Sequence, residues 1–182
     1  SFEPSISEIH YNPSTQQGSD NLWEFVEIYN HHEFGLDISG WHLADAVNAT
    51  VPPNTWLESG AYAVFANDTA SYNQLLPFTL VIPFSGNAGS FYRKCGVSFS
   101  IPFSGNSSLH NSGETIRLLR ADGSQSDYVE YSDYGGWPAE PDGGGPTLEW
   151  KGPVYENSLP SSWTPSNAFG GSPGSANSTW AD

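Results

Sequence analysis

The feature that most constrains the fold of this chain is the regular alternation of short apolar runs with turns rich in glycine and proline. The 182 residues include 19 glycines and 14 prolines, and no long window has the 3.6-residue apolar period of a helix. The runs that favour strands fall at 6–11, 23–29, 36–43, 61–66, 80–84, 97–103, 115–119, 128–131 and 147–150. About eight or nine short strands in one chain of this length predict a single all-β domain spanning 1–182, either a sandwich or a barrel.

Local turn signals predict how these strands connect. The segment 23–29 is apolar almost throughout, which favours a central strand. Within 36–43 the apolar positions change parity across Ser39 and Gly40, which indicates a bulge. Asp122-Gly123 between two alternating runs predicts a hairpin. After residue 150 the chain is rich in proline, serine and glycine, so we expect an extended tail lying over the domain.

One short motif is duplicated in the middle of the chain. The hexapeptide IPFSGN occurs at 82–87 and again at 101–106. A single pair of copies is too short for a solenoid. We interpret it as a hairpin arm, with the segment 92–96 near its tip.

The charge of the chain excludes several partners. Five basic residues stand against 20 acidic ones, giving a formal net charge of −15. Nucleic acids and anionic membranes need a basic surface that these residues cannot form. No apolar stretch is long enough to span a bilayer. The acidity is interpreted as solubility in an extracellular or salty medium, with calcium binding or attraction to a cationic partner as alternatives.

The remaining localisation signals also favour a secreted or cell-surface protein. The chain begins at Ser1 without methionine, as expected if an N-terminal segment has been removed. The chain has a single cysteine, Cys95, so an intrachain disulfide is excluded. Cys95 is either a small residue in a loop or the site of an intermolecular disulfide. The neighbouring basic residues would lower the pKa of an exposed Cys95 thiol, and Tyr92 opens the same loop. Candidate glycosylation sites follow the N-x-[ST] pattern at Asn48, Asn67, Asn106 and Asn177.

The order of motifs resembles the bacterial type of lamin tail domain. The segments that carry the resemblance are ISEIHYNP at 6–13, EFVEIYN at 24–30, LDISGWHL at 36–43, NSGETIRLL at 111–119, DGGGPTLE at 142–149 and the closing run 163–177. The resemblance covers about 5–177, leaves a short tail at 178–182, and is interrupted by an insertion at about 67–106 that holds the duplicated motif. It implies an immunoglobulin-like β-sandwich and no catalytic activity. The hairpin arm is a departure from the family, and the predicted fold is therefore such a sandwich with an inserted hairpin arm.

No residue pattern supports a catalytic, metal or cofactor site. His31 and His32 are adjacent and would point to opposite faces of a strand, while His10 and His42 could approach across strands but lack a third ligand. The G-x-S-x-G pattern at 170–174 lies in a proline-rich tail and is interpreted as a turn rather than a nucleophile elbow.

The carboxylates have two interpretations, a solvated acidic surface or, failing that, a calcium site, although no EF-hand loop occurs. The acidic residues considered are Glu24, Glu27, Glu33, Asp122, Asp127, Glu130, Asp133, Glu140, Asp142 and Glu149.

The tryptophans provide the candidate contact residues. Trp23, Trp41 and Trp150 fall in predicted strands and are expected in the core. Trp137 is either a plug over one end of the sandwich or an exposed ring for a ligand, and Trp180 is the better candidate for a contact with another molecule.

These observations lead to one main functional hypothesis and one alternative. The main one is a non-enzymatic extracellular structural or interaction module that self-associates through the arm, as a subunit of a surface or filamentous assembly. The alternative is a carbohydrate- or protein-binding module appended to a secreted enzyme. The expected partners are further copies of the chain or a surface protein or glycan.

Overall fold

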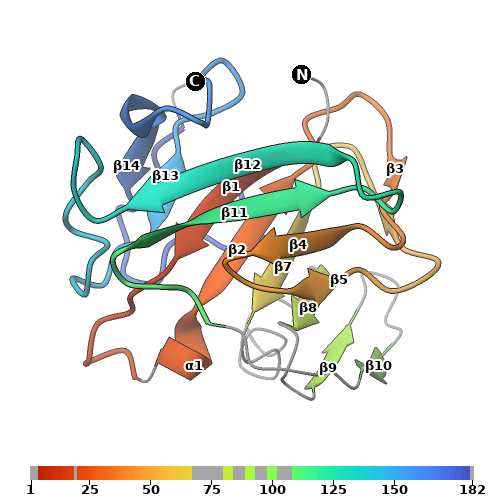
Figure 1. Ribbon diagram of the computed structural model, residues 1–182, viewed down its shortest axis with the longest axis horizontal. Helices are drawn as coiled ribbons and strands as arrows, with labels where there is room; N and C mark the ends of the chain where they lie inside the picture. Colours follow the sequence, from red (N-terminus) through yellow and green to blue (C-terminus); the bar gives the residue numbers. More distant parts are fainter. Residues whose placement is uncertain are drawn as a thin grey trace.

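The fold consists of two packed β-sheets with an extended C-terminal segment over one of them (Figure 1). A computed structural model describes residues 4–18, 20–66, 80–83, 89–92, 98–101 and 108–180. Nearly all regular structure in these residues is β, as the composition predicts. The all-β prediction is therefore confirmed.

The larger sheet has six strands in the order β14-β13-β1-β2-β7-β8. Their bounds are β1 Ser5–His10, β2 Phe25–Tyr29, β7 Tyr62–Ala66, β8 Leu80–Pro83, β13 Leu148–Trp150 and β14 Trp163–Pro165. All neighbours pair antiparallel except β7 and β8, which are parallel. The segment predicted as a central strand is indeed central, because β2 lies between β1 and β7.

The smaller sheet has four strands in the order β12-β11-β4-β5. Its strands are β4 His42–Asp45, β5 Ala49–Thr50, β11 Gly113–Leu119 and β12 Gln125–Ser132. The turn at Asp122-Gly123 joins β11 to β12 as predicted, with Gly123 at φ +86° and the Asp122 carboxylate accepting from the Ser124 N–H at 2.9 Å. Two further pairs stand apart: β3 Leu36–Asp37 with β6 Trp56–Leu57, and β9 Gly89–Tyr92 with β10 Ser98–Ile101.

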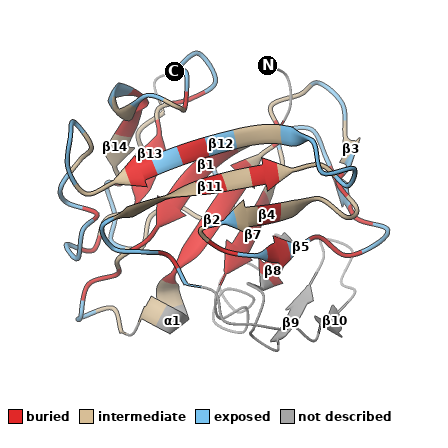
Figure 2. Cartoon of the chain, in the orientation of Figure 1, coloured by how far each residue is buried: buried red, intermediate tan, exposed pale blue. Residues whose placement is uncertain are grey.

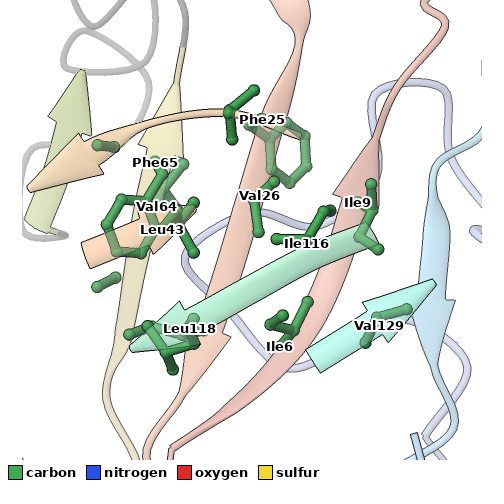
Figure 3. Close-up of a cluster of buried hydrophobic side chains, with 14 of the residues drawn as sticks. Ile6, Ile9, Phe25, Val26, Leu43, Val64, Phe65, Ile116, Leu118 and Val129 are labelled. Atoms are coloured by element: carbon green, nitrogen blue, oxygen red, sulfur yellow. The ribbon is translucent and has the colours of Figure 1, made fainter. Parts of the chain in front are cut away.

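The hydrophobic core lies between the two sheets. Strands of the larger sheet contribute Ile6, Ile9 and Val26, and the smaller sheet faces them with Leu43, Ile116, Leu118 and Val129, all at most 1% exposed (Figure 3). Alternate residues of a strand point to opposite faces, so this side of each sheet is apolar. Figure 2 shows burial concentrated in β1, β2 and β7. This architecture is the immunoglobulin-like sandwich that the resemblance implied.

The structure corrects several local predictions. Trp23 does not belong to a strand, because it ends the short helix α1, Asp20–Trp23. The predicted bulge at Ser39 and Gly40 is a turn: Trp41 N–H donates to Ile38 O, Gly40 has φ +76°, and the chain leaves the β3–β6 pair for the smaller sheet. The tail is not entirely irregular, since it contains the 3₁₀ helix η1, Pro160–Ser162, and β14.

The predicted arm is a hairpin in its described part. β9 and β10 pair antiparallel, with Tyr92 opposite Ser98. The predicted tip, with Cys95, lies outside the described residues.

Candidate binding groove and a buried carboxylate row

A groove of about 490 Å³ lies on the smaller sheet, where β11 begins and β12 ends. Its walls combine aromatic, acidic and hydroxyl residues: Glu114, Thr115, Tyr128, Glu130, Tyr134 and Trp137. Thr115 and Glu130 are directly paired across the strands, which places their side chains on one face. Pro160, from the distant segment after β13, closes another side.

The turn after β12 positions the aromatic rings of the groove. Gly135 and Gly136 adopt φ +69° and +94°, a region that side chains other than glycine rarely enter. Tyr134 N–H donates to Ser132 Oγ at 3.3 Å. Tyr134 is left 74% exposed, whereas Trp137 packs on Trp163 with ring centroids 6.1 Å apart.

The groove carries negative charge without compensation. Glu130 is exposed, and Glu114 accepts a hydrogen bond from the His110 N–H at 3.0 Å. No basic residue lines the groove. The guanidinium of Arg117 lies 5.9 Å from the Tyr128 ring centroid, but it is ion-paired with Asp45, the only salt bridge among the described residues.

A second polar feature lies on the outer face of the larger sheet. Glu8, Glu27 and Glu149 occupy three neighbouring strands, with Glu8 directly opposite both of the others. All three are 0% exposed. Directly opposed residues place their Cβ atoms only about 5 Å apart, so three carboxyl groups form one buried row.

The C-terminal segment covers this carboxylate row and supplies hydrogen-bond donors to it. The Ser172 N–H donates to Glu8 Oε1 at 2.8 Å, and the Gly174 N–H donates to Glu27 Oε2 at 2.7 Å. Glu149 accepts from three hydroxyls at 2.7–3.0 Å, those of Ser172, Ser178 and Thr179.

Two members of the row, Glu8 and Glu27, prefer their protonated forms. Burial raises the pKa of Glu8 from 4.5 to about 8; the hydrogen bond from Thr147 opposes this rise and the neighbouring Glu149 adds to it. Burial, with the Glu8 carboxyl beside it, also raises the pKa of Glu27 well above 4.5. The expectation of a solvated acidic surface is therefore wrong for Glu24, Glu27 and Glu149, which are at most 1% exposed.

Comparison with known proteins decides the family. The family model described as Lamin Tail Domain matches residues 3–133, more than half of the chain. The chain belongs to the lamin tail domain family. No curated protein and no solved structure matches it at a significant level. The family is non-catalytic and its immunoglobulin-like fold serves as a structural or protein-interaction module.

The matched range leaves part of this lamin tail domain beyond the family model. It includes Glu8 and Glu27, but Glu149 and the segment that covers the row come after residue 133. Most of the groove is within the range, whereas Tyr134 and Trp137 are just beyond it.

The predicted contact residues of the lamin tail domain lie in different environments. Trp137 is both a half-buried plug and part of the groove. Trp180 is half-buried: its Nε1 donates to Trp150 O at 2.7 Å and its ring meets Tyr29 edge-on at 4.9 Å. Tyr92 lies in β9, and Cys95 lies outside the described residues.

The candidate glycosylation sites also differ. Asn48 is exposed in the loop between β4 and β5. Asn177 is 4% exposed, and its amide donates to Ser7 O at 2.8 Å and Trp150 O at 2.9 Å. Asn67 and Asn106 lie outside the described residues.

The histidine and serine patterns do not assemble into a reactive site in the part of the chain that the structure describes. His10 and His42 lie in different sheets, and burial against Phe25 lowers the pKa of His10 to about 4. Ser172 of the G-x-S-x-G pattern is held by the carboxylate row. Within the described ranges, no group of three or more His, Cys, Asp or Glu residues is arranged to hold a metal ion, and no helix could cross a membrane.

Proposed function

We propose that this lamin tail domain is a non-enzymatic extracellular module that binds its partner through the groove between β11, β12 and the turn at Tyr134. The observation that carries the proposal is the exposure of Tyr134 beside Tyr128 and Trp137 in a concave surface. Tyrosine and tryptophan combine a large apolar ring with a polar tip, and they dominate binding energy in protein interfaces and ligand pockets.

The chemical surroundings of the groove support a binding role. Hydroxyl and carboxylate groups converge beside the rings, as in sites where a few polar groups orient a ligand. The net charge of −15 and the four sequons support an extracellular setting.

The experiment compares groove variants on immobilised arrays of glycans and of peptides. Tyr134→Ala should remove the signals that the wild-type domain gives, because the exposed ring contributes contact area without stabilising the core. Phe34→Ala is the matched control, since Phe34 is 66% exposed and lies next to β3, at the opposite end of the sandwich (Figure 1). Equal signals from Tyr134→Ala and the wild type would contradict the proposed site.

Self-association through the arm is the second candidate function. β9 and β10 pair only with each other in the described part of the chain, so each has an outer edge that a strand of another copy could extend. Light scattering after size exclusion measures the native mass. A large assembly that disappears when residues 88–100 are deleted supports this function, and a monomer near 19.7 kDa contradicts it.

A further inference from the structure

The electrostatic field around this domain is strongly negative and poorly neutralised. The formal charge of −15 arises from 20 acidic and five basic residues. Of the three basic residues in the described ranges, Arg117 is ion-paired, while Arg120 and Lys151 donate to Ser124 Oγ and Ser161 O. A field of this sign increases the association rate of cationic partners and repels anionic ones.

The groove concentrates that field beside exposed aromatic rings. Glu130 is exposed, and Glu114 on the neighbouring strand is paired with Tyr131, the residue that follows Glu130. A guanidinium or ammonium group entering the groove would meet carboxylates and the faces of aromatic rings, both of which attract cations.

The domain itself contains an example of this recognition at the edge of the groove. The Arg117 guanidinium lies over the Tyr128 ring while it pairs with the Asp45 carboxylate. Tyr134 and Glu130 offer the same two chemical groups, but with no cation of the chain beside them in the groove lining.

We propose that the groove docks a basic polypeptide segment, with an arginine or lysine side chain between Glu130 and the ring of Tyr134. This inference rests on the proposed function, because it names the class of partner that the same groove takes. A sulfated or otherwise anionic chain would be repelled by the carboxylates, and a neutral glycan could donate hydroxyl hydrogen bonds to them but would not be attracted by the negative field of the domain.

The test measures the affinity of the intact domain for a fluorescent octa-arginine peptide by anisotropy. Tyr134→Ala should weaken binding about tenfold or more, the usual effect of removing an aromatic anchor. Glu130→Gln should weaken it several-fold. Raising the salt from 50 to 500 mM should reduce wild-type affinity by at least about tenfold, because screening shortens the range of charge attraction to a few ångströms.

Matched controls separate docking in the groove from attraction to acidity in general. Glu58→Gln changes the net charge equally, from −15 to −14, but lies at the β3–β6 end (Figure 1). Phe34→Ala removes an exposed ring at that same end. Both controls should bind octa-arginine as the wild type does, and circular dichroism should show that all four variants stay folded.

The outcomes distinguish the inference from the proposed function. Equal weakening by Glu58→Gln and Glu130→Gln, or no binding, overturns the basic-segment proposal. If neutral glycans such as cellohexaose bind instead, without salt dependence and with loss in Tyr134→Ala, the groove is a binding site of another class. If no ligand on either array or in solution responds to Tyr134→Ala, the proposed function itself fails.

Discussion

Raising the pH from 6.5 to 8 should destabilise this domain, because Glu8 and Glu27 keep their protons only while the chain is folded. The pKa of Glu8 is about 8 in the folded state against the ordinary value of 4.5 for a glutamate, and burial is the main cause. As the pH rises, the Glu8 carboxyl therefore loses its proton at a lower pH in the unfolded state than in the folded state. The contribution of Glu8 to stability is complete below pH 4.5 and is lost as the pH rises through 8.

The size of the effect follows from this displacement of the pKa. Each pKa unit corresponds to about 1.4 kcal/mol, so the whole change for Glu8 is roughly 5 kcal/mol. Between pH 6.5 and 8 the free energy of unfolding should fall by about 2 kcal/mol from Glu8 alone, and Glu27 adds a loss of the same sign. For a domain of this size, about 2 kcal/mol lowers the melting temperature by roughly 4–8 °C.

Between pH 6.5 and 8, the other titratable groups with shifted pKa values contribute little to the change in the free energy of unfolding. His10, whose pKa is lowered to about 4 by burial, stabilises the fold above pH 6.5 and loses this contribution as the pH falls. Asp127, whose pKa is raised to about 6 by burial, has nearly completed its change by pH 6.5. Burial, with the charge of Glu27 as a smaller cause, also raises the pKa of Tyr62, so that it stays protonated throughout.

Urea unfolding at pH 6.5, 7 and 8 measures the effect. Glu8→Gln keeps the shape and an acceptor for the Ser172 N–H, and it should reduce the fall in stability by about 2 kcal/mol. Glu58→Gln, an exposed carboxyl, should leave the fall unchanged. A wild-type stability that stays constant from pH 6.5 to 8 would refute the protonation of buried Glu8 and Glu27 in the folded domain.

Three further predictions concern the C-terminal segment. Expression in a glycosylating host should leave Asn177 unmodified while exposed Asn48 accepts a glycan, because the Asn177 amide is buried and donates two hydrogen bonds; peptide mass spectrometry checks this. Gly171→Ala should cost several kcal/mol, since its Cβ would collide with the Glu8 carboxyl, whereas Gly123→Ala, at a similar φ but in open space, should cost only about 1 kcal/mol in thermal unfolding. Trp180→Ala should destabilise by about 2–4 kcal/mol, and unchanged stability would show that this ring is free for a partner.

Local chemistry made part of the fold predictable. Asp122-Gly123 is a turn signal contained in two adjacent residues, and the structure has the predicted hairpin between β11 and β12 at this position. The nearly continuous apolar run at 23–29 predicted a central strand, and β2 lies between β1 and β7. Trp23 was misplaced because an apolar run cannot by itself distinguish a strand from a single helical turn.

The carboxylate row could not be predicted from local pattern. Glu27 alternates with Val26 and Ile28, which is also the pattern of a solvated strand face. What buries it is a segment about 150 residues later, and what makes it a row is the register of three strands. The groove likewise depends on a contact between segments far apart in the sequence, because Pro160 lines it together with the turn at Tyr134. The sequence therefore indicated Trp137 as a contact residue but gave no signal for Tyr134.

A titration of the ¹⁵N-labelled domain with octa-arginine, followed by backbone amide chemical shifts, tests the groove most directly. We expect saturable changes confined to 112–115 and 128–137, and their absence in Tyr134→Ala. Shifts spread evenly over the acidic surface, or centred on another part of the sandwich, would contradict the groove as the binding site of this lamin tail domain.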